Sequence, residues 1–453
     1  MHWNFLRPNS LAVITDLESY SWSFLNNQIS CVAYYLSKQG LKIDQTVAIL
    51  ANNSIDLLFC QLAVIANGSK VLLLNPSLPY DLLKDLFIYL NIDFLIDFEY
   101  NEKYIFNCPK LDYSNYRKYK ITNNFRLVSF SKIVKQPAIL ILTSGSTNGQ
   151  PKAVVHNILA YLNSAYSVLN LINYQQSDCW LLSLPLFHVS GQGILWRWLV
   201  RGGVIALKSK SSFELHNISH ISLVPTQLFK FLKINKNMFS SLKAILLGGE
   251  MIPTILTKKI ACLGISCWNS YGITEMASTV CAKLADGKNG VGLPLIGKQV
   301  RLIKNEIQIK SNSQALGYWV NGKIIPLNCT DGWFNTRDKG VFINNEYHIL
   351  GRLDNLFISG GECVQPEYIE KIINSHPYVI QSFIIPIKDD KFGQRPVAVL
   401  ELEKGSLIGD VAKWLKYKLA PYQYPVAFYS LIPELKSNRV KVSRQQIKNW
   451  LLK

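Results

Sequence analysis

The order of apolar and polar positions along the first three hundred or so residues predicts an α/β fold. Residues 18–40 carry apolar side chains at helical spacing and end at Gly40, a natural helix stop. The apolar run 47–51 predicts a buried strand, 54–68 a helix and 70–76 a second strand. A strand, a helix and a strand of these lengths form a βαβ unit with parallel pairing. The alternation continues through residues 81–98, 138–142, 157–172, 219–233 and 243–247.

The pattern changes after about residue 290, where short strand-like segments separated by turns predict a small barrel-like part. From residue 366 onward the chain reads as helix, strand, strand, helix and helix, which predicts a compact α+β unit. We therefore expect a large N-terminal domain at 1–352 with parallel-rich sheets layered with helices. A small, mobile C-terminal domain at 355–453 would follow, with a hinge at 353–355.

Composition narrows the class of protein. Hydrophobic residues make up 49% of the 453 residues, and charged residues make up 17%, below the roughly 25% of an average soluble domain. Intrinsic disorder needs low hydrophobicity and high net charge, so this composition excludes it. We find no uncharged apolar run near the roughly 20 residues that span a bilayer, and no secretory signal at the start. These features predict a soluble protein of the cytoplasm, or of the plastid stroma if the gene is organellar.

Charge and cysteines argue against two further classes. The net charge of +18 contains no block of five like charges, so we favour compositional drift over a nucleic-acid footprint. The nine cysteines form no Cys-x-x-Cys pair, which argues against disulfides and structural zinc. His216 and His220 are spaced for one face of a helix but lack the glutamate of a zinc motif, and we interpret them as a surface pair.

The sharpest local signal lies at residues 138–156, where an apolar strand runs into Thr143-Ser-Gly-Ser-Thr-Asn-Gly-Gln-Pro-Lys152. Glycines admit backbone N–H groups close to an anion, hydroxyls add donors and the lysine adds charge, so the loop suits phosphate. The loop is not a Walker A motif. Further motifs follow in order: LGGE (247–250), NSYGITEMAST (269–279), GWFNTRDKG (332–340), GRLDNLFISGGECVQPEYIE (351–370) and LKSNRVKVSRQQI (435–447).

In this order and spacing the set resembles the adenylate-forming superfamily of acyl-CoA synthetases, adenylation domains and luciferases, over nearly the whole chain. SLPLFHVSGQGILWRWLVRGG (183–203) and SLVPTQL (222–228) resemble more narrowly the AMP-forming acid–CoA ligases that act on o-succinylbenzoate in menaquinone or phylloquinone biosynthesis. The resemblance implies ATP, Mg²⁺ and coenzyme A as co-substrates and cofactors, and no nucleic-acid partner. It also implies two steps, in which the acid attacks the α-phosphate of ATP and CoA then attacks the resulting acyl-adenylate.

The resemblance also implies roles for residues at the matching positions. The phosphate contacts would be Thr143, Ser144, Gly145, Ser146, Thr147 and Lys152, with Thr274 at the α-phosphate and Glu275 carrying Mg²⁺. The adenine pocket would hold Gly248, Gly249, Glu250 and Tyr271, and the ribose hydroxyls would meet Asp338 and Arg352. The mobile domain would supply Lys441 for adenylation, Asp354 as hinge, and Gly360 and Gly361 to leave room for pantetheine.

The acid pocket is expected around the helix that carries Arg197. A buried arginine needs a carboxylate partner, and its planar guanidinium suits the ring carboxylate of o-succinylbenzoate. A salt bridge to an Asp or Glu of this protein is the alternative. His188 would shape and gate this pocket, and Ser190, Gln192 and Gly193 are weaker candidates to line it.

Two departures from the family pattern and three other functions stay open. The phosphate loop is one residue longer than usual, at Asn148, and Arg439-Val440 precede Lys441 where the family places a glycine, so Lys436 is the fallback. Because Lys441 lies among other basic residues, it can also be read as part of an exposed basic face. Alternative functions are a CoA ligase for another aryl or fatty acid, an adenylation module that loads a carrier protein, and a non-enzymatic basic binder.

Overall fold

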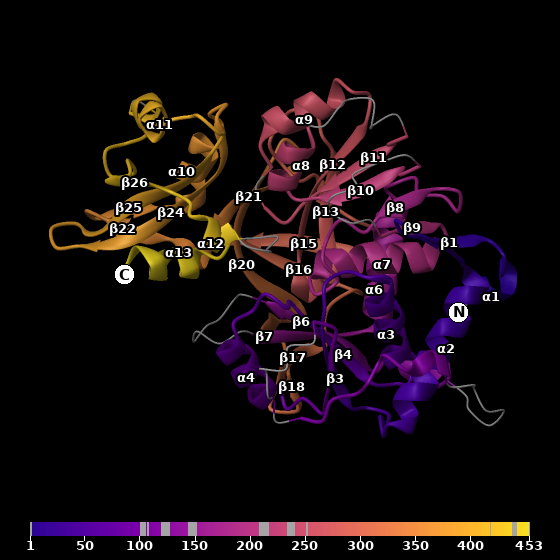
Figure 1. Ribbon diagram of the computed structural model, residues 1–453. Helices are drawn as coiled ribbons and strands as arrows, with labels where there is room; N and C mark the ends of the chain where they lie inside the picture. Colours follow the sequence, from indigo (N-terminus) through magenta and orange to yellow (C-terminus); the bar gives the residue numbers. More distant parts are fainter. Residues whose placement is uncertain are drawn as a thin grey trace.

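Two mainly parallel sheets form the larger part of the protein (Figure 1). The computed structural model describes residues 2–99, 106, 108–118, 127–143, 152–207, 217–232, 241–250, 252–416, 418–436 and 442–452, without the side chains of Ile255 and Lys436. In the order of its strands the first sheet contains β14 (Leu293–Pro294), β13 (Ser278–Leu284), β12 (Ser266–Ile273), β11 (Ala244–Leu247), β10 (His220–Leu223), β8 (Cys179–Leu181), β9 (Val204–Ala206), β1 (Leu11–Ile14) and β2 (Ser19–Ser21).

The second sheet lies on the other side of a layer of helices. Its order is β18 (Lys323–Ile325), β17 (Gly317–Val320), β7 (Lys152–Asn157), β6 (Pro137–Thr143), β4 (Lys70–Leu74), β3 (Thr46–Leu50) and β5 (Phe94–Asp97). β3 pairs with β4 and β5 in parallel and β4 pairs with β6 in parallel, as the βαβ pattern predicts.

Alternating side chains of the strands build the layers. Val47 and Ile49 join the core between the sheets, whereas Ala48 and Leu50 join the core on the outer face of the second sheet. The middle layer contains α2 (Trp22–Lys38), α3 (Ile55–Ala66), α6 (Ile158–Leu169) and α7 (Val189–Arg201). The outer layers are α8 (Pro225–Phe231) and α9 (Thr254–Ala261) on the first sheet, and α4 (Tyr80–Tyr89) on the second. The shorter helices of the large part are α1 (His2–Leu6), η1 (Tyr116–Lys118), α5 (Phe130–Ile133) and η3 (Thr274–Met276).

The part predicted to be barrel-like is an antiparallel sheet. It runs β15 (Lys298–Ile303), β16 (Glu306–Ser311), β20 (Trp333–Ile343) and β19 (Cys329–Thr330), with β21 (Glu346–Arg352) on β20. A single turn of helix, η4 (Leu353–Asn355), leads from β21 into the smaller domain.

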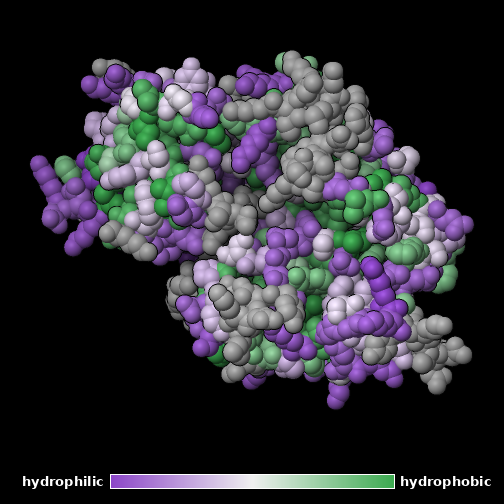
Figure 2. Space-filling model, in the orientation of Figure 1, coloured by the Kyte–Doolittle hydropathy of each residue, from purple (hydrophilic) through white to green (hydrophobic). Residues whose placement is uncertain are grey.

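The smaller domain, orange to yellow at the left of Figure 1, has the predicted α+β order and two features that the pattern missed. Its sheet contains β23 (Glu362–Val364), β22 (Phe357–Ser359), β25 (Gly393–Leu402), β24 (Val379–Asp389) and β26 (Ala427–Ser430). Its helices are α10 (Pro366–Ile373), α11 (Ile408–Leu415), α12 (Pro433–Lys436) and α13 (Arg444–Leu451). The missed elements are the strands β23 and β26, whereas β22 lies in one of the short segments predicted to be strand-like. Figure 2 shows hydrophobic side chains over much of the visible face of this domain.

Two further observations bear on the sequence predictions. His220 begins β10 and is 1% exposed, packed against the rings of Tyr174 and Trp180, so its interpretation as a surface residue on a helix was wrong. His216 lies outside the described residues. Within the described ranges, none of the helices has the length and apolar character needed to cross a membrane.

Gly191, in the first turn of α7, offers a test of the packing between α7 and the loop before it. A Cβ at this position would lie 2.0 Å from the carbonyl oxygen of Pro185. Gly409, in the first turn of α11, has open space at the same place. Alanine is the better helix former. We nevertheless expect Gly191→Ala to lower the Tm, because the main chain at Leu184 and Pro185 would have to move. Gly409→Ala should leave the Tm unchanged or raise it; equal Tm values for the two variants would contradict this packing.

Candidate active site

The expected phosphate loop begins and ends on paired strands. Thr143 closes β6 and Lys152 opens β7, the two residues are partners in the antiparallel register, and Thr143 Oγ1 donates to the Lys152 carbonyl at 3.3 Å. Ser144, Gly145, Ser146 and Thr147 lie outside the described residues. The structure therefore places both ends of this loop at one edge of the second sheet.

Lys152 and Glu275, which are far apart in the chain, are brought together by Tyr318 of β17. The Lys152 Nζ lies 4.9 Å from the centre of the Tyr318 ring, and the Tyr318 hydroxyl donates to Glu275 Oε1 at 2.9 Å. Burial, and then the Glu275 charge, raise the pKa of Tyr318, so its hydroxyl stays a donor. Nothing in the sequence pattern had singled out Tyr318, because it lies outside the motifs.

Glu275 fits a magnesium ligand of the kind that shares its ion with phosphate. It is half-buried, and within the described chain its only recorded side-chain contact is Tyr318 on Oε1, with no lysine or arginine in ion-pair distance. The described residues contain no cluster of three or more His, Cys, Asp or Glu that could enclose a metal ion. A single carboxylate with phosphate oxygens and water is the usual Mg²⁺ arrangement.

Tyr271, Asp338 and Arg352 form one hydrogen-bonded network. Asp338 is 5% exposed; its Oδ2 accepts from the Tyr271 hydroxyl and its Oδ1 from Arg352 Nη1 at 3.0 Å. Burial alone would lower the pKa of Arg352, but Asp338 and Asp354 raise it above its ordinary value. Burial and the Asp338 charge raise the pKa of Tyr271. The network thus fixes the Asp338 carboxylate, the Arg352 guanidinium and the Tyr271 hydroxyl where β12, β20 and β21 lie close together.

The LGGE segment lies beside this network. Gly248 and Gly249 follow β11, which pairs in parallel with β12, the strand that carries Tyr271. A Cβ on Gly248 would lie 2.6 Å from Ser270 Oγ. Gly249 has a φ of +87°, in the region that favours glycine. Glu250 follows directly, and the adenine-pocket candidates therefore share one corner of the first sheet.

Arg197 lies on α7 with 2% of its surface exposed. Its Nη2 donates to Thr279 Oγ1 at 3.4 Å, and its guanidinium lies 5.3 Å from the centre of the Trp180 ring. Its buried Nε has no hydrogen-bond partner among the residues that the structure describes. Burial lowers the pKa of Arg197 to about 9. No carboxylate among the described residues pairs with Arg197. The alternative, a salt bridge to an Asp or Glu of this protein, therefore finds no support among those residues.

The other acid-pocket candidates surround the start of the same helix. His188 is the residue before α7 and packs edge-on against Phe187, with ring centres 4.8 Å apart, and Ser190 is half-buried in the first turn. Gly193 faces Arg197: a Cβ there would lie 3.0 Å from Arg197 Nη2 and 3.1 Å from Ser278 Oγ. Gln192 is fully buried and its amide is engaged internally, with Gln61 at 2.8 Å and the Leu186 carbonyl at 2.6 Å.

The expected hinge carries an ion-pair bridge. Asp354 in η4 accepts from Arg337 Nη1 at 3.0 Å and from Arg352 Nη2 at 3.1 Å. Beyond it, Gly360 and Gly361 form the two-residue turn of the β22–β23 hairpin, with φ of +60° and +86°. A turn with positive φ at both positions favours glycine for conformational reasons alone.

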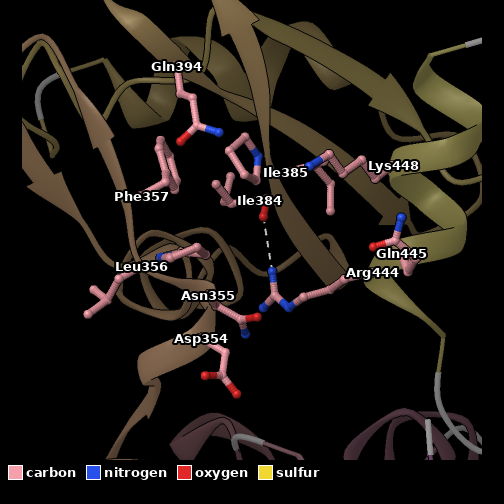
Figure 3. A pocket seen from close by; sticks show the side chains of 12 residues that line it. Asp354, Asn355, Leu356, Phe357, Ile384, Ile385, Gln394, Arg444, Gln445 and Lys448 are labelled. Carbon is pink, nitrogen blue, oxygen red and sulfur yellow. Dashed lines mark hydrogen bonds between the residues drawn. The ribbon is translucent and has the colours of Figure 1, made fainter. Parts of the chain in front are cut away.

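A cavity of about 260 Å³ lies beside the hinge, with Asp354 and Asn355 in its lining (Figure 3). Arg444, the first residue of α13, points from its wall toward Asn355 and donates to the Ile384 carbonyl at 3.0 Å. The same guanidinium pairs with buried Glu370 of α10 at 2.5 Å. These contacts fix α13 against α10 and β24. Lys441 and the side chain of Lys436 lie outside what the structure describes.

Fold and site together define a two-domain α/β protein with polar groups suited to a nucleotide along the edges of two sheets. The chain belongs to the AMP-binding enzyme family: the family model matches residues 2–319, and the model of the family's C-terminal domain matches residues 368–441.

Relatives resemble the chain over its full length. The 2-succinylbenzoate–CoA ligase of Escherichia coli is 43% identical over 99% of this chain and 97% of its own, and that of Salmonella typhimurium is 42% identical over the same shares. An arginine-to-lysine variant of E. coli MenE with bound OSB-AMS is similar with a TM-score of 0.90 at 41% identity, over 99% of this chain and 97% of its own. Bacillus subtilis MenE in complex with the acyl-adenylate intermediate OSB-AMP gives 0.86 at 26% identity, over the same shares. The B. subtilis enzyme in complex with ATP and magnesium ion gives 0.85 at 26% identity, over 99% of this chain and 98% of its own.

Proposed function

We propose that the protein is an AMP-forming acid–CoA ligase that converts o-succinylbenzoate to o-succinylbenzoyl-CoA. The observation that carries the proposal is the full-length similarity, at 41–43% identity, to 2-succinylbenzoate–CoA ligases of three bacteria. The guanidinium of Arg197 is buried, and no carboxylate of the described residues pairs with it. This supports the choice of a dicarboxylic acid, because a second carboxylate would supply a counter-charge.

The reaction has two steps. An oxygen of the succinyl carboxylate attacks the α-phosphorus of ATP, the bond to the β-phosphate breaks, and pyrophosphate leaves. The thiol of CoA then attacks the acyl carbonyl carbon, its proton passes to solvent, and AMP leaves with the oxygen that joined it to the acyl group. The first step brings an anion toward a polyanion, so positioning and fixed positive charge must supply most of the rate.

The phosphates would be held by the loop at Thr143–Lys152. Its expected contacts, Ser144, Gly145, Ser146 and Thr147, add hydroxyl and backbone donors between the two ends that the structure describes. Lys152 supplies charge, Thr274 meets the α-phosphate, and Glu275 offers its free oxygen to Mg²⁺. When bound, Mg²⁺ neutralises phosphate charge; the Tyr318 hydrogen bond supports this role by fixing the carboxylate that would hold the ion.

The nucleoside would lie between β11, β12 and β20. Gly248, Gly249, Glu250 and Tyr271 would line the adenine pocket, and Asp338 with Arg352 would bind the ribose. A carboxylate can accept several hydrogen bonds, so Asp338 can take a ribose hydroxyl while Arg352 stays in place. The existing network supports this assignment, because it fixes the position of the nearly buried carboxylate.

The acid would lie against α7. Arg197 would bind the ring carboxylate, with Gly193 leaving the space between that guanidinium and Ser278. Ser190 and His188 would border the pocket at the start of the helix, and Gln192 would act from behind by holding the loop at Leu186.

The small domain would serve both steps. Lys441 would approach the carboxylate and α-phosphate during adenylation, and rotation about Asp354 would then bring the β22–β23 turn, with Gly360 and Gly361, to the pantetheine. The bridge from Asp354 to Arg337 and Arg352 supports the hinge, because exposed ion pairs of this kind are worth about 1 kcal/mol or less and can be exchanged.

Product mass tests the function directly. With ATP, Mg²⁺ and CoA, we expect o-succinylbenzoate to yield o-succinylbenzoyl-CoA, AMP and pyrophosphate, and benzoate or fatty acids to yield far less. Thioester from another acid alone would assign the protein to a different ligase, and transfer only to a phosphopantetheinylated carrier would assign it to the loading modules. No AMP from any acid would overturn the enzymatic proposal.

Arg197→Lys tests the acid pocket. A lost bidentate, charge-assisted contact should lower kcat/KM for o-succinylbenzoate about 10- to 100-fold, as expected for about 1.5–3 kcal/mol. The same variant should act almost normally on 4-oxo-4-phenylbutanoate, which lacks the ring carboxylate. Arg201→Lys, one turn later on α7, is the matched control. An equal loss on both acids would show that Arg197 has only a structural role.

Replacing the two candidate lysines decides the register at the C-terminus. We expect Lys441→Ala to abolish most adenylate formation, measured as pyrophosphate release, because the reacting anions lose their mobile cation. Thioester formation from supplied acyl-adenylate and CoA should persist. Lys436→Ala should leave both steps nearly intact; the reverse pattern would move the role to Lys436.

A further inference from the structure

The turn that carries Thr274 and Glu275 has a strained backbone. Ala277 and Ser278, which are not glycine, have φ of +51° and +96°. Such conformations cost about 1–3 kcal/mol each and persist where the surroundings enforce them. Gly272 lies directly under the bend: a Cβ there would be 2.2 Å from the Ser278 carbonyl oxygen.

Four consecutive carbonyls of this turn each accept a hydrogen bond from a residue outside the turn. His156 Nε2 of β7 donates to the Thr274 carbonyl at 2.9 Å, and the Ala315 N–H donates to that of Glu275 at 2.8 Å. Ser164 of α6 donates to the Ala277 carbonyl at 2.5 Å. The remaining carbonyl, that of Met276, accepts hydrogen bonds from Lys298 and Ser313.

Lys298 and Ser313 bind the Met276 carbonyl together. Lys298 Nζ donates to it at 3.3 Å and to Ser313 Oγ at 2.5 Å, and Ser313 Oγ donates to the same carbonyl at 2.9 Å. Lys298 is 6% exposed, and no carboxylate of the described chain forms an ion pair with it. Burial lowers the pKa of Lys298 to about 7. A buried amine with only neutral partners is costly, and stability alone would favour an apolar side chain here.

We propose that Lys298 is a positioning residue for the adenylation step, which fixes the Met276 carbonyl so that Thr274 and Glu275 face the nucleotide. The inference deepens the proposed function and rests on it. His156, Ser164 and Ser313 complete the same support, each at one carbonyl of the turn. Releasing one carbonyl would let the strained bend relax, and a displacement of about 1 Å at a reacting group can cost about 100-fold in rate.

The test is Lys298→Met, which keeps the length of the side chain and removes its donor. We expect a Tm equal to or above that of the unaltered protein, because a buried amine has been removed. Pyrophosphate release should fall about 10- to 100-fold, and half-maximal rate should require more Mg²⁺. MgATP binding, measured by calorimetry without acid, should weaken, whereas thioester formation from supplied acyl-adenylate and CoA should change little.

Two further variants keep the test decisive. Ser313→Ala removes only the second donor to the Met276 carbonyl. It should also raise the Mg²⁺ requirement, by less than Lys298→Met does. If Lys298→Met does not fold, the Mg²⁺ requirement of Ser313→Ala decides whether the support of this carbonyl matters for adenylation. Lys70→Met is the matched control, since Lys70 is a buried lysine paired with Asp44 at the start of β4. It should lower the Tm and leave the Mg²⁺ requirement unchanged.

The outcomes separate this inference from the proposed function. A folded Lys298→Met protein with normal MgATP binding and a normal Mg²⁺ requirement would overturn the positioning role. An equal loss in both half-reactions would also overturn it, because that result indicates general damage. If the unaltered protein binds MgATP but does not adenylate o-succinylbenzoate, the substrate assignment fails and the binding comparison still decides the role of Lys298.

Discussion

The strand–turn–strand segment from Tyr271 to Thr279 is the constraint on which the geometry of the site depends. Its first residue bonds to Asp338, its middle carries Glu275 against Tyr318, and its last bonds to Arg197. Three regions that would bind ribose, metal and acid therefore share one stretch of backbone. A shift of that backbone would change all three spacings at once, which explains why its carbonyls have so many donors.

The sheets deliver these groups to one place. In parallel α/β sheets the carboxyl ends of neighbouring strands meet at one edge, and ligands bind in the crevice outside that edge. The LGGE segment follows β11 and the 274–277 turn follows β12, two adjacent strands of the first sheet. Thr143 ends β6 in the second sheet, and β17 brings Tyr318 alongside β7. The candidate site therefore draws on both sheets.

Much of this could be predicted from the sequence, because the information was local. Apolar runs marked the strands, helix caps such as Ser54 marked the helices, and the motifs marked the turns. The support of the 274–277 carbonyls could not be predicted, since His156, Ser164 and Lys298 lie far from the turn in sequence and share no spacing with it. Tyr318 was missed for the same reason. The interpretation of His220 was wrong because a spacing of four residues suits a helix face even where the chain forms a strand.

Two buried cations, Arg197 and Lys298, lie in the region of the candidate site. Arg197 and Lys298 are both buried, and burial lowers the pKa of each, with Arg197 adding repulsion at Lys298. Neither has a carboxylate partner within the described chain, so the described residues of this region carry more positive than negative charge. Under the proposed function, an acid with two carboxylates would supply the counter-charge: its ring carboxylate would bind Arg197, and its second carboxylate would approach the phosphates. Because Thr279 and Ser278 border Arg197 at one end of the bend and Glu275 lies at the other, filling the acid pocket would also stabilise the turn that holds the nucleotide. Binding of the acid and binding of the nucleotide would then support each other, as the first step requires.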